Sequence, residues 1–222
     1  MERPLVALTF DDGPSAYRPA TLEALRGERA VATFFDVGVR VRANPHLVRF
    51  AAEEGHLVLN HTLTHPPLTE LGAEAVRREL LDAEEAFAEA GVAPPFRAVR
   101  PPFLALDAAV SRIAAALGFS CIGGYGPPDY LPATTAAEIR DGVLAHLEPG
   151  AVVVLHDGAI DSSAGAETVA ALPAVVRGIR AAGFELGGLD ATGAVVPRAY
   201  RGTERPVPPV SGSVPFRPPL GG

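Results

Sequence analysis

The sequence predicts an α/β domain in which a parallel, barrel-like sheet is surrounded by helices. Three observations lead to this fold: short apolar runs alternate with longer segments of helical period, the runs number seven, and six helical segments connect them. With 222 residues, of which 48% are apolar, the chain is long enough to form one domain with a buried core.

The seven apolar runs have the length of buried strands. In chain order, the predicted strands are Leu5 to Phe10, Val31 to Asp36, Leu57 to Asn60, Arg97 to Val99, Phe119 to Ile122, Ala151 to Leu155 and Phe184 to Leu189.

The clearest helical segment is Glu74 to Ala90, which places Val76, Leu80 and Phe87 on one stripe and charged residues opposite. It ends before Gly91, as helices often do. Weaker patterns of the same kind predict helices over Arg18 to Leu25, Pro45 to Glu54, Asp107 to Leu117, Ala136 to Leu147 and Thr168 to Ala182.

The chain divides into residues 1–196, which carry the α/β pattern, and a proline-rich tail, residues 197–222. The tail has no hydrophobic period and holds seven of the 22 prolines. We expect it to be extended, and it either packs along the domain or is disordered.

Composition excludes several classes of function. A net charge of −7 and scattered basic residues disfavour nucleic acid and membrane surfaces as partners. All 19 basic residues are arginines, so lysine-based chemistry is absent, and the single Cys121 is expected in the core. No stretch is apolar enough to span a bilayer, and no leader follows Met1. The protein is therefore expected in the cytoplasm if Met1 is the native start, or outside the cell if a leader has been removed. The oligomeric state is left open.

Ionisable residues follow the ends of five predicted strands. In parallel α/β folds these carboxyl ends meet at one edge, where catalytic groups gather. We therefore expect one site to contain Asp11, Asp12, His61, His65, Arg100, Asp129 and His156.

His61 and His65 have the spacing of metal ligands, because imidazoles at i and i+4 point the same way on a helical turn. Two histidines and one carboxylate leave an ion with open positions, as a catalytic site requires. Asp11 and Asp12 would repel each other unless a cation separates their roles, so that one binds the ion and the other takes a proton. Without the histidines, Asp-Asp-Gly-Pro is more simply interpreted as a turn.

His156 ends an apolar strand, where a catalytic role competes with that of an ordinary buried histidine. Arg100 is held by two following prolines, which suits a guanidinium that binds a carboxylate, whereas Arg97 is interpreted as a surface residue. His46, His56 and His146 lie on or beside predicted helices and are expected to be structural or solvated.

These motifs together resemble the polysaccharide deacetylases with a NodB homology domain, carbohydrate esterase family 4. The resemblance covers about Leu5 to Leu189 and is carried by Thr9-Phe-Asp-Asp-Gly-Pro14, His61-Thr-Leu-Thr-His65, Arg100-Pro-Pro-Phe103 and Leu155-His156-Asp157. It implies a distorted (β/α)7 barrel and a metal-dependent hydrolase that removes N-acetyl groups from amino sugars, such as chitooligosaccharides or peptidoglycan.

The resemblance also implies a role for each motif residue. Asp11 would be the general base, steadied by Arg100, and His156 the general acid. Asp12, His61 and His65 would bind one divalent ion, with zinc expected and cobalt or nickel as alternatives. The backbone N–H of Phe103 would hold the oxyanion, and Leu155 would line the acetyl pocket.

The fourth motif departs from the family pattern, since this chain has Tyr125-Gly-Pro-Pro-Asp129-Tyr130 where an Asp-Trp pair is usual. Asp129 can still orient His156, while Tyr130 replaces the tryptophan and Tyr125 lies nearby. The protein surface on which the sugar would stack therefore differs from the usual family pattern. Two alternatives remain: the same centre acts on an ester such as acetylxylan or on a small natural-product amide, or the chain is an inactive sugar-binding relative.

Overall fold

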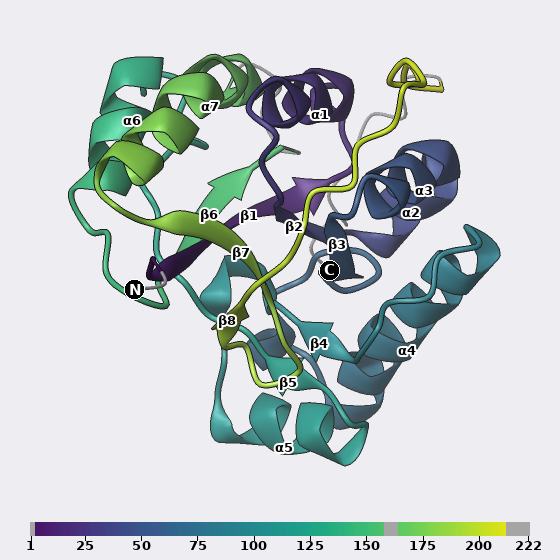
Figure 1. Ribbon diagram of the computed structural model, residues 1–222. Coiled ribbons are helices and arrows are strands. Elements are labelled where there is room, and N and C mark those ends of the chain that lie inside the picture. Colours follow the sequence, from purple (N-terminus) through teal and green to yellow (C-terminus); the bar gives the residue numbers. More distant parts are fainter. Residues whose placement is uncertain (1–2, 158–163, 212–222) are drawn as a thin grey trace.

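The computed structural model describes residues 3–157 and 164–211, which form a curled, mostly parallel sheet with helices around it (Figure 1). This half-barrel confirms the predicted α/β fold of the distorted (β/α)7 type. The strands are β1 (Leu5–Gly13), β2 (Thr33–Asp36), β3 (Leu57–Asn60), β4 (Ala98–Val99), β5 (Ser120–Cys121), β6 (Val152–His156), β7 (Glu185–Leu189) and β8 (Val195–Val196).

The sheet has the order β5-β4-β3-β2-β1-β7-β8, and β6 also pairs with β1. All neighbours run parallel except β8, which is antiparallel to β7. After β5, Tyr125 makes an isolated parallel bridge to Val153 of β6. This bridge brings the far end of the sheet round towards β1, so the carboxyl ends of the strands surround one opening.

The helices and the two short 3-10 turns fill the connections between strands. They are α1 (Arg18–Gly27), α2 (Gly38–Ala43), α3 (Pro45–Glu53), η1 (Leu68–Glu70), α4 (Ala73–Glu89), η2 (Pro102–Leu104), α5 (Ala108–Ala116), α6 (Ala136–Leu144) and α7 (Ala164–Ala181).

All seven predicted strands and all six predicted helices are present, with small shifts at their ends. Besides the two 3-10 turns, helix α2 and strand β8 were not predicted. Helix α2 has only six residues and leads almost directly into α3, so it shows no stripe of its own. Strand β8 has two residues and pairs with β7 alone.

Local sequence signals explain where several helices begin and end. The carboxylate of Asp107 accepts hydrogen bonds from two N–H groups at the start of α5. Thr135 and Glu138 form a reciprocal capping box at the start of α6. After α4, Gly91 adopts a φ of 72°, which a glycine takes up without a steric penalty.

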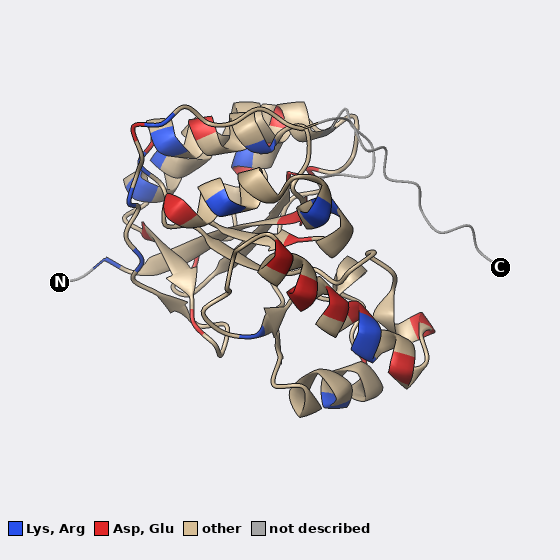
Figure 2. Cartoon of the chain, turned by 90° about the vertical axis from the view of Figure 1, so that its right-hand side faces the viewer, with Lys and Arg blue, Asp and Glu red and all other residues tan. Residues whose placement is uncertain are grey.

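The main core lies between the central strands and the helices, and Leu8, Phe10, Phe34 and Val153 are fully buried in it. Charged residues of both signs are distributed over the helices, and acidic residues recur along α4 (Figure 2). No helix in the described ranges is long and apolar enough to cross a membrane.

The first part of the tail, residues 197–211, packs along the domain beside α3 (yellow in Figure 1). The Arg198 side chain donates to the carbonyl of Gly55 (2.6 Å), and the Arg201 N–H donates to the carbonyl of Glu54 (2.9 Å). Further along, the Ser211 N–H donates to Asn44 Oδ1. Of the two alternatives for the tail, residues 197–211 therefore follow the first and pack along the domain. Residues 212–222 lie outside the described ranges. The division at residue 196 stays a prediction.

Candidate active site

The strand ends meet at a cavity of about 570 Å³. Strand β1 continues through Asp11 and Asp12 to Gly13, three residues further than predicted, and Asp11 pairs directly with His156 of β6. The lining residues are Asp11, Asp12, His61, His65, Phe103, Leu104, Tyr125, Gly126, Pro127, Tyr130, Val154 and His156. Five of the seven residues predicted from strand ends thus share one cavity with Phe103, Tyr125 and Tyr130, whereas Arg100 and Asp129 do not line it.

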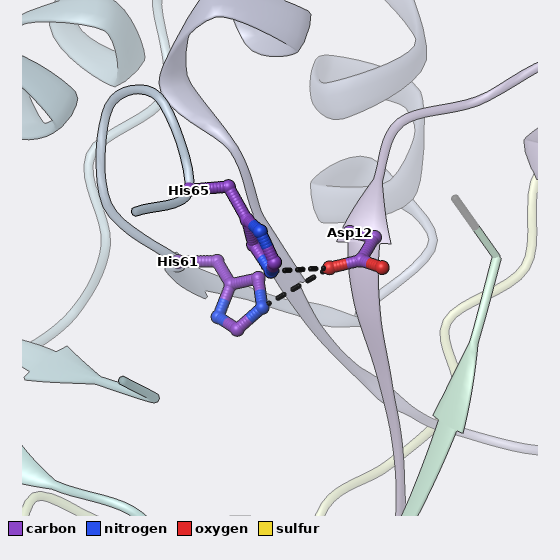
Figure 3. A group of neighbouring side chains, drawn as sticks. All are labelled: Asp12, His61 and His65. Atoms are coloured by element: carbon purple, nitrogen blue, oxygen red, sulfur yellow. Dashed lines mark ion pairs between the residues drawn. The ribbon is translucent and has the colours of Figure 1, made fainter. Parts of the chain in front are cut away.

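Asp12, His61 and His65 form a compact cluster (Figure 3). One ligand atom from each lies within 4.8 Å of the others. Asp12 Oδ1 lies 3.2 Å from His61 Nε2 and 2.9 Å from His65 Nε2. Two imidazole nitrogens and one carboxylate oxygen are a donor set that binds a divalent transition metal. The three predicted ligands therefore do come together.

The reason given for the histidine spacing was wrong, because residues 61–65 form an irregular loop and not a helical turn. Thr62 and His65 both have positive φ values, 67° and 65°. The Thr62 N–H donates to Asn60 Oδ1 at 2.7 Å, and the His65 N–H donates to Thr62 Oγ1 at 3.0 Å. These bonds fold the loop back, so both imidazoles face Asp12.

A residue from α4 holds the same loop from outside. Glu79 accepts hydrogen bonds from the N–H groups of Leu63 and Thr64 and from the Thr64 hydroxyl, at 2.7 to 2.9 Å. Asn60 is itself fixed, since its side-chain amide donates to the carbonyl of Leu80. The ligand loop is therefore held rigidly by groups that the sequence pattern did not single out.

The orientation of His61 fits metal binding. Its Nδ1 lies 2.7 Å from the carbonyl of Arg100 and donates to it, so Nε2 is the nitrogen that faces Asp12 and is placed to bind a metal ion. Burial alone would raise the pKa of Asp12, but hydrogen bonds and charges from His61 and His65 hold it well below its usual range. Asp12 is thus a carboxylate, the form that binds a cation. Together these features fit the requirements of a divalent metal ion.

Asp11 is held in one position by Arg100. The Arg100 guanidinium donates to Asp11 Oδ1 at 2.6 Å and to Thr9 Oγ1 at 2.7 Å, and it lies 4.1 Å from the centre of the Phe35 ring. Arg100 is completely buried, whereas Asp11 retains a small exposed surface at the cavity. Part of the Asp11 carboxylate is therefore accessible to a molecule in the cavity.

His156 is paired with Asp129 in the same way. His156 Nδ1 lies 2.7 Å from Asp129 Oδ1, and Asp129 Oδ2 accepts from the His156 N–H and from the Thr168 hydroxyl. Burial would lower the pKa of His156, but the hydrogen bond and charge of Asp129, with smaller effects from Asp11 and Asp12, raise it to about 9. The imidazole is therefore protonated at neutral pH.

The predicted substrate residues lie at different depths. Phe103 and Tyr130 are exposed at the mouth, with their rings 4.9 Å from the ring of His65 and 5.4 Å from that of His156. Tyr125 also lines the cavity, and its hydroxyl donates to the carbonyl of His146. Leu155 is fully buried in the core, and its neighbour Val154 lines the cavity instead. A role for Leu155 in the acetyl pocket stays a prediction.

A buried ionic cluster beneath the site was not predicted. The Arg18 guanidinium bonds to the carboxylates of Asp36 and Asp157, and all three side chains are completely buried. Gly13 lies directly above them, and a Cβ there would overlap Arg18 and both carboxylates. The sequence signals for this cluster are the positions of Asp36 and Asp157 at strand ends, whereas Arg18 stands at a helix start with no partner motif.

A half-barrel, three candidate metal ligands, a carboxylate held by Arg100 and a protonated imidazole form the combination expected of a metal-dependent hydrolase. The family model described as polysaccharide deacetylase matches residues 1–122, which include the three metal-site residues, Asp11 and Arg100. The chain belongs to the polysaccharide deacetylase family, as the motifs predicted.

The relatives agree with this assignment. The chain is 34% identical over 189 residues to a chitooligosaccharide deacetylase of Sinorhizobium fredii, covering 82% of this chain and 88% of that protein. It is 34% identical over 183 residues to a peptidoglycan-N-acetylglucosamine deacetylase of Bacillus cereus, covering 81% and 84%. Among solved structures, a family 4 carbohydrate esterase from Streptomyces lividans in complex with acetate matches with a TM-score of 0.79 and 31% identity, over 87% of this chain and 97% of that one.

Proposed function

We propose that this enzyme hydrolyses the acetamide group of N-acetylated amino sugars, with Asp11 as general base and His156 as general acid. The proposal rests on one observation: these residues are direct partners on β1 and β6 and line the same cavity as the three candidate metal ligands. Each is held by its own buried partner, Arg100 or Asp129. A base and an acid in fixed, separate positions are what amide hydrolysis requires.

Asp12, His61 and His65 would hold the divalent ion. When bound, the ion supplies positive charge that acidifies water and polarises an amide carbonyl. We propose zinc, because three nitrogen and oxygen ligands with open positions suit it, although the same donors also accept cobalt or nickel.

Two side chains then move the two protons that the reaction requires. Asp11 accepts a proton from the attacking water, and the Phe103 N–H donates to the acetamide oxygen as negative charge develops there. His156 donates its proton to the amide nitrogen, which leaves as an amine. An oxyanion donor commonly contributes roughly 3 to 4 kcal/mol to the transition state.

The protonated state of His156 favours an amide over an ester as the substrate. An amine is a poor leaving group unless it is protonated, so an acid with a pKa of about 9 is present in the right form at neutral pH. The esterase alternative, acting on acetylxylan, uses the same residues and is compared directly in the assay below.

Acetate release after metal removal tests the proposal. We expect the chelated protein to lose activity on N-acetylated chitooligosaccharides and to regain it when zinc, cobalt or nickel is added back. Parallel assays with acetylated xylan compare amide and ester hydrolysis. Failure with every substrate and metal would support the sugar-binding alternative and contradict the proposed function.

The pH profile tests the role of His156. Activity should fall as pH rises through the pKa of His156, because the imidazole then loses the proton it must donate. Replacing Asp129 with asparagine removes the charge that raises this pKa, so the alkaline limb of kcat/KM should move down by roughly one to three pH units. The matched control is Thr168→Val, which removes a hydrogen bond to Asp129 but keeps its charge. An unmoved alkaline limb in the asparagine variant would exclude His156 as the acid.

A further inference from the structure

The apolar surface of this protein is concentrated at the mouth of the active site. Seven large apolar side chains are exposed in the described part of the chain, and four of them line the active-site cavity or the hollow beside it. These four are Phe103, Leu104, Tyr130 and Leu131. Together with Leu106, which stands two residues after Leu104 in the chain, we call them the apolar lip, and their exposed fractions are 47% to 63%.

The apolar lip flanks the reacting groups on two sides. On one side the ring of Phe103 packs edge-on against His65, and on the other the ring of Tyr130 packs edge-on against His156. Leu104 lines the same cavity as the two histidines. Leu131 lines an adjoining hollow of about 750 Å³, which shares Tyr125, Gly126 and Pro127 with the active-site cavity. The apolar surface is therefore continuous with the site.

Two neighbouring residues of the apolar lip have a strained backbone conformation. Phe103 and Leu104 are consecutive residues with φ values of 58° and 52°, a left-handed conformation that costs non-glycine residues on the order of 1 kcal/mol or more each. Such strain persists where the surrounding structure holds it, commonly at ligand sites. Here the two residues in this conformation have exposed apolar side chains.

The cavity offers few groups for sugar hydroxyls. Beyond the catalytic and metal-site residues, its described lining consists of Phe103, Leu104, Tyr125, Gly126, Pro127, Tyr130 and Val154. None of these side chains is charged, and the Tyr125 hydroxyl already donates to His146. A hydroxyl buried against leucine without a partner is unfavourable, and three of the five lip residues are leucines, which lack a ring for stacking on sugars.

We propose that the natural substrate is an amphiphilic amino sugar, in which the N-acetylated ring carries an alkyl or aryl group that lies against the apolar lip. This inference rests on the proposed deacetylase function and specifies its substrate class. The sugar enters far enough to place its acetamide at the metal cluster, and the apolar substituent leaves water by contacting Leu104, Leu106 and Leu131.

A comparison of glycosides with the same reacting group tests the inference. The octyl glycoside of N-acetylglucosamine, below its critical micelle concentration, is compared with the methyl glycoside and with fully N-acetylated chitotriose. We expect kcat/KM to be at least about tenfold higher for the octyl than for the methyl glycoside, since each buried methylene favours transfer from water. The octyl glycoside should also exceed chitotriose.

The double variant Leu106→Ser/Leu131→Ser removes lip residues that do not line the reacting cavity. It should lose most of the octyl advantage while the kinetics on the methyl glycoside stay unchanged. Leu81→Ser, an exposed leucine on α4, is the matched control and should leave both substrates unaffected.

Each other outcome overturns the inference in a recognisable way. Equal rates on the two glycosides, or better turnover of chitotriose, would refute the amphiphilic substrate and leave the deacetylase function intact. If the lip joins two copies of the chain, the double variant would change the sedimentation of the protein and not the octyl preference. If no substrate is turned over, calorimetric binding of the two glycosides to the Asp11→Asn variant decides the question, and equal affinities would refute it.

Discussion

Replacing Asp11 with asparagine is expected to reduce kcat by roughly a hundredfold to ten-thousandfold while leaving metal affinity within about twofold of the wild type. Asparagine keeps an oxygen that can accept the hydrogen bond from Arg100, which is 2.6 Å long in the wild type. It cannot, however, take a proton from water at neutral pH. Asp11 lies outside the cluster formed by Asp12, His61 and His65, so the ion should still bind.

Two measurements separate the roles of the adjacent carboxylates. Acetate release gives kcat, and competition with a chromogenic chelator gives the affinity for zinc. The paired variant Asp12→Asn should lose metal affinity, because it replaces a charged ligand with a neutral one. If Asp11→Asn kept full turnover, or lost the metal as Asp12→Asn does, the division of roles between the two residues would be wrong.

The strand-end rule explains why so much of the site was predictable. Asp11, His61 and His156 each follow an apolar run that is too short for a helix, and parallel strands bring their carboxyl ends together. Each run therefore predicts a strand, and it also predicts that the residue after the run lies at the carboxyl end of that strand. No long-range pairing had to be known to place these residues at one opening.

The ligand loop shows the limit of arguments from spacing. His61 and His65 converge as predicted, but through a loop with two positive φ values that Asn60 and Glu79 hold in place. Glu79 is some fifteen residues further along the chain, on the polar face of α4, and nothing in its own sequence environment marks it as a loop anchor. The convergence of His61 and His65 was predictable from the sequence, but the loop conformation that produces it was not.

The tail could not be decided from sequence for a related reason. Residues 197–211 have no period, and their packing depends on acceptors near α3, such as the carbonyls of Glu54 and Gly55 and the side chain of Asn44. Backbone carbonyls are present in every sequence, so only the folded structure shows which ones are free to accept.

Arg18 is the clearest residue that sequence reasoning missed, because a lone arginine at a helix start is usually solvated. Its partners Asp36 and Asp157 are 18 and 139 residues further along the chain. The guanidinium also lies 3.8 Å from the centre of the Phe34 ring. The ion pairs connect the ends of β2 and β6 beneath Gly13, so they support the strand ends that carry Asp12 and His156.

Replacing Arg18 with methionine is expected to destabilise the protein by about 3 to 5 kcal/mol, because it leaves two buried carboxylates without a cation. For a domain of this length, the melting temperature should fall on the order of 10 °C. Urea unfolding and calorimetry measure the loss. The control is Arg42→Met, which removes a surface pair with Glu89 and should cost at most about 1 kcal/mol.

The pH dependence of this loss identifies its electrostatic origin. In the wild type, burial raises the pKa of Asp157 to about 6, and Arg18 opposes that rise. Without Arg18 the pKa of Asp157 rises further, so the folded variant binds more protons than the unfolded chain above pH 4 and loses stability as pH increases. The difference from the wild type should thus be largest above pH 7 and narrow as pH falls towards 5.

A triple variant separates charge from packing. Arg18→Met combined with Asp36→Leu and Asp157→Leu contains no buried charge at this position, and apolar replacement of a buried ion cluster is often neutral or stabilising. We expect it to regain most of the stability that the single variant loses, without the pH dependence. If the triple variant were as unstable as the single one at every pH, the loss would come from packing against Phe34 and not from the stranded carboxylates.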